Sequence, residues 1–290
     1  SVLFVIPWGR HWLIGTTDTD WHLDRNHPAA SKADIDYLLD HVNAVLAKKI
    51  TRDDIEGVYA GLRPLISGHT DGADQTAKLS REHVVVEPAP GLVVVTGGKY
   101  TTYRVMAEDA VDVAVSDFDT EVPESVTENL TLLGGDGFPA LWNERGRLAR
   151  NAGLTQQQLE HLLRRYGSCI DELLELIAAD PELRRPIGKS DYLRVEAVYA
   201  ASHEGALHLE DVLTRRTRIS IEEWDRGLAA APEVADLIAP VLGWSEETKK
   251  QEIDRYRGRV EAERASQEHP DDSSANEARG GAADLFDVTA

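Results

Sequence analysis

The segment Leu92-Val93-Val94-Val95-Thr96-Gly97-Gly98-Lys99-Tyr100-Thr101-Thr102-Tyr103-Arg104 organises the first half of this 290-residue chain. Its opening residues are mostly β-branched, and the run is long enough for a buried strand but too short for a helix. Two glycines then end the strand, since a residue without a Cβ lets the backbone turn sharply or approach a ligand closely. We expect a helix directly afterwards, capped by Thr101 or Thr102 and continuing through Val115.

The same segment predicts a binding site that would stabilise an electron-rich ligand atom. Free N–H groups and the positive end of the helix dipole would meet there with the ammonium group of Lys99. Taken alone, however, a Gly-Gly pair between a strand and a helix is more often a plain turn, and one lysine is most often a solvated surface residue. Other segments must therefore decide between these interpretations.

Composition excludes several kinds of partner. The chain has 31 Lys+Arg against 51 Asp+Glu, a net charge of −20, which disfavours nucleic acid and broad attachment to anionic lipid. Any anion site must therefore be local. The single cysteine, Cys169, excludes an internal disulfide and is typical of a cytoplasmic protein. No apolar run is long enough to span a membrane, and no metal site is expected.

The first half is predicted to contain more strand than helix. Residues 2–8 and 11–17 are typical of a hairpin, and Ser31 with Asp34 forms a capping signature before a helix that ends near Lys48-Lys49. Residues 55–66 and 80–87 are predicted strands, with a polar loop over 67–77 between them. Short connections favour a mixed or largely antiparallel sheet, in an α+β fold.

The second half is predicted to be helical. The expected helices cover residues 155–166, 170–179, 192–203, 209–216, 221–230, 234–242 and 244–264. The charge-dense last helix is most simply a solvated face. From residue 266 onward the chain is polar and acidic, so disorder is expected. We therefore predict a sheet region at 1–118, a linker at 119–136, a helical domain at 137–264 and a disordered tail at 265–290.

Three basic side chains stand at predicted strand ends or at the glycine turn, namely Arg63, Arg81 and Lys99. Guanidinium groups grip phosphate oxygens in a bidentate way, and an ammonium group adds a point charge. In a chain this acidic, such a cluster would select a small dianion. The structural alternative is that each arginine pairs with a local carboxylate, and residue spacing alone does not separate the two. The local carboxylates in question are Asp53, Asp54 and Glu82.

Five short motifs, in order along the chain, carry a resemblance to a known family. They are Phe4 to Trp8, Ile14 to Asp18, Gly61 to Leu65, Ser80 to His83, and Gly97 to Arg104. The chain resembles the C-terminal portion of the FAD-dependent, respiratory-type glycerol-3-phosphate dehydrogenases. The resemblance is close over residues 1–115 and looser up to about residue 264.

This resemblance implies oxidation of sn-glycerol 3-phosphate to dihydroxyacetone phosphate, with hydride passing to FAD and electrons then to a quinone. It places Arg63, Arg81 and Lys99 in the substrate site. The segment beside the flavin ring would comprise Gly97, Gly98, Lys99, Tyr100 and Thr101. The resemblance also implies peripheral contact with the inner face of the cell membrane, and it leaves homodimer formation open.

Part of the expected site is not found in these residues. No GxGxxG fingerprint occurs, so we expect the FAD-binding Rossmann portion to precede residue 1 in a longer protein, and the chain alone to bind FAD weakly or not at all. No catalytic base is identified, and His11 and His83 are the only candidates near the motifs. Two other functions are left open: a non-catalytic interaction or dimerisation module, and a related amine- or hydroxy-acid-oxidising flavoenzyme.

Overall fold

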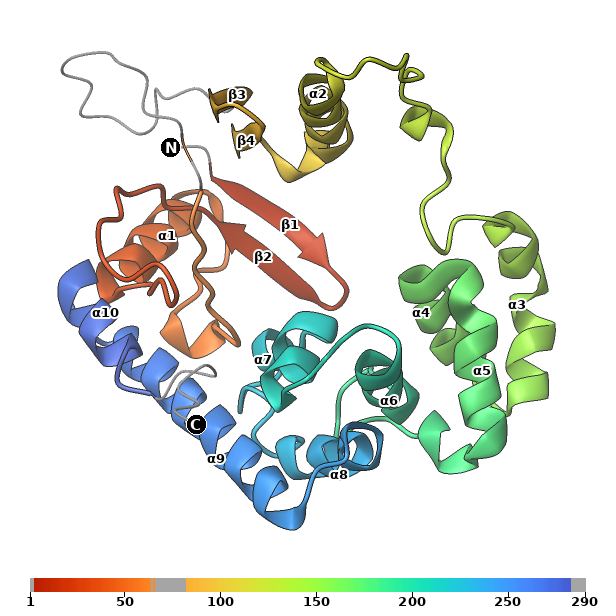
Figure 1. Ribbon diagram of the computed structural model, residues 1–290. Helices are drawn as coiled ribbons and strands as arrows, with labels where there is room; N and C mark the ends of the chain where they lie inside the picture. The colour runs from red at the N-terminus through yellow and green to blue at the C-terminus, as the bar shows by residue number, and fades with distance from the viewer. Residues whose placement is uncertain (1–2, 64, 66–81, 283–290) are drawn as a thin grey trace. The chain divides into compact units, whose positions relative to one another are not determined.

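The structure is a computed structural model that describes residues 3–63, 65 and 82–282. It is α+β, as the sequence predicts (Figure 1). The described strands form two separate antiparallel ribbons, which are smaller than the single sheet that we expected. By its contacts the chain divides into two compact units. The first contains the described residues of 18–22 and 61–131, and the second contains those of 3–17, 23–60 and 132–282.

The first ribbon, in the second unit, is the hairpin predicted at the start of the chain. β1 (Phe4–Trp8) and β2 (His11–Gly15) are antiparallel, with Phe4 opposite Gly15 and Trp8 opposite His11. A Cβ added at Gly15 would lie 2.7 Å from Cζ of Phe4. The ring of Phe4 therefore covers the end of β2 only because the facing residue is glycine.

Helix α1 (Lys32–Val45) begins at the predicted capping box. The Ser31 hydroxyl accepts the Asp34 N–H at 3.4 Å, and the Asp34 carboxylate accepts the Ser31 N–H at 3.0 Å. These two bonds satisfy donors that the first helical turn leaves without a partner. Arg52 then contacts Asp36 at 2.9 Å, which ties α1 to the following 3₁₀ turn (Arg52–Asp54).

The strand predicted over residues 55–66 is wrong, because residues 55–63 form no regular secondary structure. A Cβ added at Gly57 would lie 2.5 Å from the carbonyl oxygen of Ile221 and 2.8 Å from Nη1 of Arg226. Gly57 thus lies close to the helical region, whose backbone groups do not offer a strand's ladder of donors and acceptors. Most of the predicted 67–77 loop and the start of the next strand lie outside the described residues.

The second ribbon belongs to the first unit. β3 (His83–Ala89) and β4 (Leu92–Gly97) are antiparallel, with Val85 opposite Val95 and a register shift after Val86. Gly91 in the connecting turn has a φ of +76°, which favours glycine. A 3₁₀ turn (Tyr100–Thr102) leads into α2 (Tyr103–Val115), which packs on both strands. A further 3₁₀ turn (Thr127–Asn129) lies between α2 and α3.

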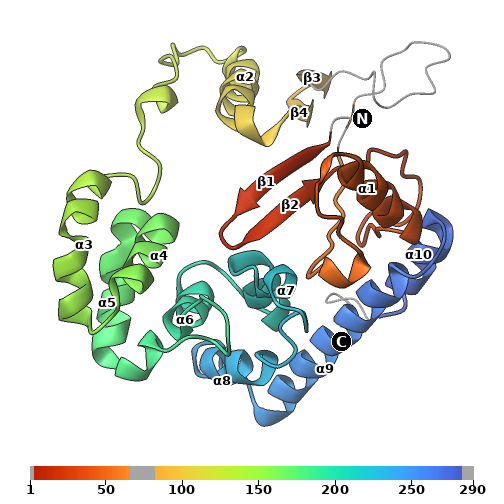
Figure 2. The ribbon, with the colours of Figure 1, turned by 180° about the vertical axis from the view of Figure 1, so that it is seen from behind.

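The rest of the second unit is helical (Figures 1 and 2). Its longer helices are α3 (Phe138–Ala152), α4 (Gln156–Tyr166), α5 (Ile170–Ala179), α6 (Arg194–Ser202), α8 (Ala231–Leu242) and α9 (Glu246–Ser266). The predicted capping box of α4 is present, since Thr155 and Gln158 exchange N–H bonds of 2.9 and 3.2 Å. Gly167 ends α4 with a φ of +56°, as the sequence predicts.

Two hydrophobic clusters form the interior of this helical region. One gathers side chains of α3, α4, α5 and α6, including Leu159 and Ile170. The other gathers side chains of α6, the segment Asp211–Arg216, α8 and α9, including Leu213 and Ile238. Helix α6 contributes to both clusters. The two halves of the helical region are therefore joined through α6, and α6 lies directly against α8.

Two predicted helices differ from the structure. Residues Asp211–Arg216 form a π-helix, and the helix predicted over 221–230 is only the short α7 (Ile219–Glu222). The Asp225 carboxylate accepts the N–H groups of Gly227 and Ala229 at 2.9 and 2.7 Å. These bonds compete with helical hydrogen bonds, and the left-handed φ of +62° at Arg226 completes the interruption.

The disordered tail predicted from residue 265 is wrong as far as residue 282. α10 (Asp272–Arg279) packs against α9, and Ala275 is fully buried between them. Asp271 caps α10 by accepting the Ser274 N–H at 2.9 Å, and Arg279 lies 3.5 Å from the Glu263 carboxylate. A cap and an ion pair thus hold a helix that has almost no apolar face. Residues 283–290 lie outside the described part.

Helix α9 is also not simply the solvated charged face that we expected. Glu252 and Arg259 are each only 4% exposed. The Glu252 carboxylate accepts the Leu209 N–H at 3.0 Å and lies 3.1 Å from Nδ1 of His208. This buried charge is therefore used to hold the segment before the π-helix.

Candidate functional site

The glycine turn that follows β4 has the backbone conformation that its sequence predicts. Gly97 and Gly98 have φ values of +74° and +84°, a region that side chains other than glycine rarely adopt. A Cβ added at Gly98 would lie 2.5 Å from Sδ of Met106 and 3.0 Å from Cβ of His83. Glycine is therefore required here so that α2 can fold back on β3, whether or not a ligand approaches the turn.

The start of α2 differs from the prediction in one respect. Thr102 occupies the N-cap position, but its side chain forms no capping bond. Its hydroxyl donates instead to the carbonyl oxygen of Lys99 at 3.1 Å, so the hydroxyl stabilises the 3₁₀ turn. A 3₁₀ turn rather than an α-helix thus follows the glycines directly. The missing threonine cap leaves the first N–H groups of α2 without that side-chain partner.

Three predicted site residues lie on the solvent side of this turn. Lys99 and Thr101 are exposed, and Tyr100 is 91% exposed. The rings of Tyr100 and Tyr103 are stacked, with centroids 5.8 Å apart. The turn therefore presents a cation and an aromatic pair next to the start of α2.

His83, one of the two histidines considered as a base, has a structural partner. Its Nε2 lies 2.6 Å from Oδ2 of Asp109 on α2. The pair links β3 with α2 beside the close contact at Gly98. His83 therefore acts as a connection within the first unit. The other histidine, His11, contacts the Glu56 carboxylate in the second unit.

Arg63 pairs with a carboxylate that the sequence did not single out. Its Nη1 lies 2.6 Å from Oδ2 of Asp18, the last residue of the motif that follows β2. Asp54, a partner expected under the structural alternative, instead accepts the N–H of Thr51 at 2.8 Å. The ion pair brings together two of the five motifs that carry the family resemblance.

The structure places the three predicted cations as follows. Arg63 is held by Asp18, Lys99 is exposed at the glycine turn, and Arg81 lies outside the described residues. No described hydrogen bond or ion pair connects Arg63 with Lys99. Convergence of the three on one ligand therefore stays a prediction.

A second polar arrangement holds the tip of the first hairpin against the helical region. Trp8 Nε1 donates to the Glu222 carboxylate at 3.1 Å, and the Arg218 guanidinium lies over the Trp8 ring at 4.5 Å from its centroid. Tyr192 donates to the same Glu222 oxygen at 3.4 Å. The hairpin is thus anchored by Trp8, and Arg10 adds a longer contact of 3.7 Å to Glu223.

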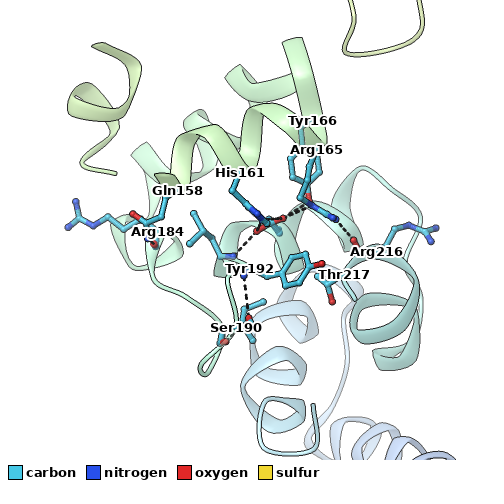
Figure 3. A network of polar contacts seen from close by, with 12 residues as sticks. Gln158, His161, Arg165, Tyr166, Arg184, Ser190, Tyr192, Arg216 and Thr217 are labelled. Carbon is cyan, nitrogen blue, oxygen red and sulfur yellow. Dashed lines mark hydrogen bonds and ion pairs between the residues drawn. The ribbon is translucent and has the colours of Figure 1, made fainter. Parts of the chain in front are cut away.

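An extensive polar network surrounds Glu196 on α6, which is fully buried (Figure 3). Its carboxylate accepts the Leu193 N–H at 2.7 Å and the Tyr166 hydroxyl at 3.2 Å. Nε2 of His161 and Nε of Arg165 lie 3.0 and 2.9 Å from its oxygens. These residues join α4 to the start of α6. The sequence signal for this network was the position of Glu196, three residues after the N-cap of α6.

Burial and charge change the ionisation of the tyrosines around this network. Burial and, to a smaller extent, the nearby Glu222 carboxylate raise the pKa of Tyr192 to about 12. Burial and the charge of Glu196 likewise raise the pKa of Tyr166 far above its ordinary value. Both hydroxyls therefore stay protonated and act as hydrogen-bond donors at neutral pH. This is the behaviour of a structural network.

Two other features are absent from the described residues. In residues 3–63, 65 and 82–282, no cluster of three or more His, Cys, Asp or Glu side chains is arranged to hold a metal ion. Among the helices described, none combines the length and the apolar character needed to cross a membrane.

Comparison with known proteins defines the class. A family model described as FAD dependent oxidoreductase matches residues 1–110, and one described as the C-terminal domain of alpha-glycerophosphate oxidase matches residues 125–249. The first match ends within α2, and the second begins between α2 and α3. The chain therefore belongs to the FAD-dependent oxidoreductases that carry this C-terminal domain.

Individual relatives narrow the class. The chain is 57% identical over 283 residues to glycerol-3-phosphate dehydrogenase 2 of Mycobacterium tuberculosis, and 56% identical to the glycerol-3-phosphate dehydrogenase of Mycobacterium leprae. Each match covers 97% of this chain and 48% of the relative. The chain thus spans about half the length of these relatives, and the resemblance inferred from its five motifs is confirmed.

A solved structure supports the same placement. The glycerol-3-phosphate dehydrogenase from Bacillus halodurans, complexed with FAD, superposes on this chain with a TM-score of 0.73 at 27% identity. The match covers 89% of this chain and 50% of that chain. The described fold is therefore that of a part of an FAD-containing enzyme of this family.

Proposed function

We propose that this chain takes part in the FAD-dependent oxidation of sn-glycerol 3-phosphate to dihydroxyacetone phosphate, with electrons passing to a quinone. The observation that carries the proposal is the 57% identity, over 97% of this chain, to a glycerol-3-phosphate dehydrogenase. This identity supports the proposal that the five motifs serve the same kind of site. An enzyme of this class needs a phosphate-binding surface and a flavin-binding surface, and the chain supplies residues for both.

Phosphate binding is assigned to Arg63, Arg81 and Lys99. A phosphate monoester carries up to two negative charges, and two guanidinium forks with one ammonium group match its oxygens. The Asp18 contact occupies only one nitrogen of Arg63, so the rest of the fork stays available. Holding the phosphate fixes the position of the carbon that is oxidised, which supplies orientation to the reaction.

Flavin contact is assigned to the turn residues Gly97, Gly98, Lys99, Tyr100 and Thr101. The two positive φ values expose backbone at the turn, and α2 begins there without a threonine cap. These features fit a ring edge that gains electron density, because helix N-termini and ammonium groups stabilise negative charge. FAD would supply the hydride acceptor. The residues of this chain would bind, orient and shield it.

Neither His11 nor His83 is assigned as the base that accepts the hydroxyl proton. Each lies against a carboxylate, Glu56 or Asp109, that connects two segments of its own unit. We assign both histidines to positioning the motifs in which they occur. Along the chain, residues 1–118 are assigned to the substrate and flavin side and residues 137–264 to the helical domain, with 119–136 between them.

The electron acceptor and the cellular setting rest on the family resemblance. A quinone acceptor implies peripheral contact with a membrane, and a homodimer through the helical domain is compatible with its independent core. Reduction of a soluble quinone analogue tests the acceptor, sedimentation with lipid vesicles tests the contact, and sedimentation velocity tests the oligomer.

The central experiment is the visible absorption spectrum of the purified chain after incubation with FAD and desalting. Retained flavin absorption and its bleaching by glycerol 3-phosphate under anaerobic conditions would support the proposal. Glycerol, an amino acid and a hydroxy acid serve as control substrates. Bleaching by an amino acid or a hydroxy acid instead would support a related oxidase. A colourless chain with no response would support either a partial enzyme that needs the expected N-terminal portion or a non-catalytic module.

A further inference from the structure

The contact between Arg63 and Asp18 connects two motifs whose paired residues lie 45 positions apart in the sequence. Asp18 ends the segment that leaves β2, and Arg63 belongs to the Gly61 to Leu65 motif. The two atoms in contact, Nη1 and Oδ2, are 2.6 Å apart. A charge-assisted bond of this length holds the side chain of Arg63 in one orientation.

The contact engages one edge of the guanidinium. Arginine has five N–H donors in a rigid planar fork, and the described contact uses only Nη1. Nε and Nη2 lie on another edge, which can hold two phosphate oxygens at once. The side chains of Arg63 and Asp18 are 39% and 29% exposed, so a small anion can reach the pair.

We propose that Asp18 is a positioning residue that orients the Arg63 guanidinium for the phosphate group of the substrate. This inference rests on the proposed function, because Arg63 acts there as a phosphate ligand. A free arginine side chain loses considerable rotamer entropy when it binds an anion. Asp18 brings about part of that ordering before the substrate arrives, and preorganisation of this kind raises affinity.

The opposing effect is repulsion between the Asp18 carboxylate and the phosphate. Two observations favour orientation over repulsion: the contact is monodentate, and both side chains are partly exposed to screening solvent. In addition, the proposed function sets the single negative charge of Asp18 beside several cations. A carboxylate that competed with the phosphate would be expected to cover the fork by a bidentate contact.

The test measures binding of glycerol 3-phosphate to the 290-residue chain by isothermal titration calorimetry, with glycerol as the phosphate-free control. The variants are Asp18→Asn, Arg63→Gln and the double variant. Asp254→Asn is a matched control, because it removes a 2.8 Å contact between a carboxylate and Nη1 of Arg257 on α9. Circular dichroism and the unfolding midpoint establish that each variant is folded.

Asp18→Asn should weaken binding of glycerol 3-phosphate about fivefold and leave glycerol binding unchanged, because only phosphate recognition depends on the fork. Arg63→Gln should weaken it about tenfold. The double variant should lose no more than Arg63→Gln, since the proposed positioning role of Asp18 is exerted through the Arg63 guanidinium. Asp254→Asn should bind like the wild type.

Two results would overturn the proposal while the proposed function stands. If the wild type prefers glycerol 3-phosphate to glycerol and Asp18→Asn binds equally well, Asp18 has no positioning role. If Asp18→Asn binds more tightly, the carboxylate competes with phosphate. A wild-type chain with no preference for the phosphorylated ligand overturns phosphate binding itself, and the positioning role with it.

Discussion

The β3–β4–α2 segment and the helical region from α3 to α9 are both rich in apolar residues, yet their interiors differ. Among the described residues of 82–131, no side chain is buried, and Val84, Val86 and Leu92 are 41%, 42% and 52% exposed. In the helical region, Leu159 and Ile238 are 0% exposed within two clusters. The pattern of apolar residues thus predicted helices and strands in both regions, but only the helical region has a buried hydrophobic core.

The difference shows that the burial of an apolar side chain depends on which segments pack against it. α2 packs on the ribbon near Gly98, and the strand residues Val84, Val86 and Val94 keep apolar surface exposed. A two-stranded ribbon is only marginally stable in water without such packing. The helical region closes on itself through α6. We therefore expect the two regions to respond very differently to substitution.

The largest effect is expected at Glu196 in the helical region. Glu196→Ala removes the acceptor for Leu193 and leaves the guanidinium of Arg165 without its buried counter-charge. Removing one partner of a buried pair destabilises a protein by about 3–5 kcal/mol. The free energy of unfolding from guanidinium titration measures this loss. Glu182→Ala, at an exposed pair with Arg185, is the control, and equal losses would contradict the importance of burial.

A somewhat smaller effect is expected from truncating the core. Leu159→Ala should lower the free energy of unfolding by about 2–5 kcal/mol, because it leaves a cavity among α4 and its neighbours. Val94→Ala on β4, where the side chain is 36% exposed, should cost less than about 1 kcal/mol. Denaturant titration of both variants makes the comparison directly. A loss at Val94 as large as that at Leu159 would show that the ribbon is buried in solution.

Gly98→Ala tests the β3–β4–α2 segment by itself. Alanine at a φ of +84° is strained, and its Cβ would meet Sδ of Met106 at 2.5 Å. We expect a cost of about 1–3 kcal/mol, confined to the contact between β4 and α2. Amide hydrogen exchange should become faster in residues 83–115 and remain unchanged in α6 and α8. Gly91→Ala, also at positive φ but with open space around its Cβ, separates strain from collision.

The smallest effect is expected in the pH dependence of stability, through the carboxyl group of Glu204. Burial raises the pKa of this carboxyl, and Arg165 and Arg216 offset only part of the rise. Its Oε2 is buried and has no hydrogen-bond partner in the described part of the chain. The folded state therefore holds the proton more tightly than the unfolded state. The resulting stability is full below the ordinary pKa of 4.5 and is lost as pH rises through the raised value.

Glu204→Gln should remove this loss, so that thermal stability falls less between about pH 4 and about pH 8 than in the wild type. Glu182→Gln is the control with the opposite sign. Arg185 lowers the pKa of the exposed Glu182, so that carboxyl adds stability as pH rises. Unfolding midpoints measured across this range would reveal the two slopes, and parallel curves for Glu204→Gln and the wild type would contradict the assignment.

Local sequence signals predicted local structure well. The capping boxes at Ser31 and Thr155, the hairpin near residue 9 and the helix over 170–179 are all present. Each of these features depends on residues within a few positions of one another. Their energies are therefore set before any distant segment is placed.

Features that depend on distant residues were missed. Gly57 lies close to Ile221 in a segment that forms no strand, and α10 packs against α9. The burial of Glu196 and Glu252 is likewise decided by segments far along the chain. Composition alone predicts solvent exposure for such residues, since it does not show which charges meet.

The candidate site, like the fold, was predicted from the sequence in its local features and not in its distant contacts. The sequence singled out Arg63, Lys99 and the glycine turn, and the turn has the predicted backbone conformation. It did not single out Asp18, although Asp18 ends one of the quoted motifs. A carboxylate that closes a motif after a strand was the available signal. Arg81 lies outside the described residues, so its place in the site stays a prediction.

The sequence by itself determined the family, the order of most elements and the chemistry carried by its motifs, because these depend on residue type and short-range spacing. Only the tertiary structure decided that Asp18 holds Arg63, that Glu196 is buried, and that one apolar region has a core while the other exposes its strands. Contacts of this kind join residues that are far apart in the chain. Their free energy depends on distance and burial, which a linear pattern does not contain.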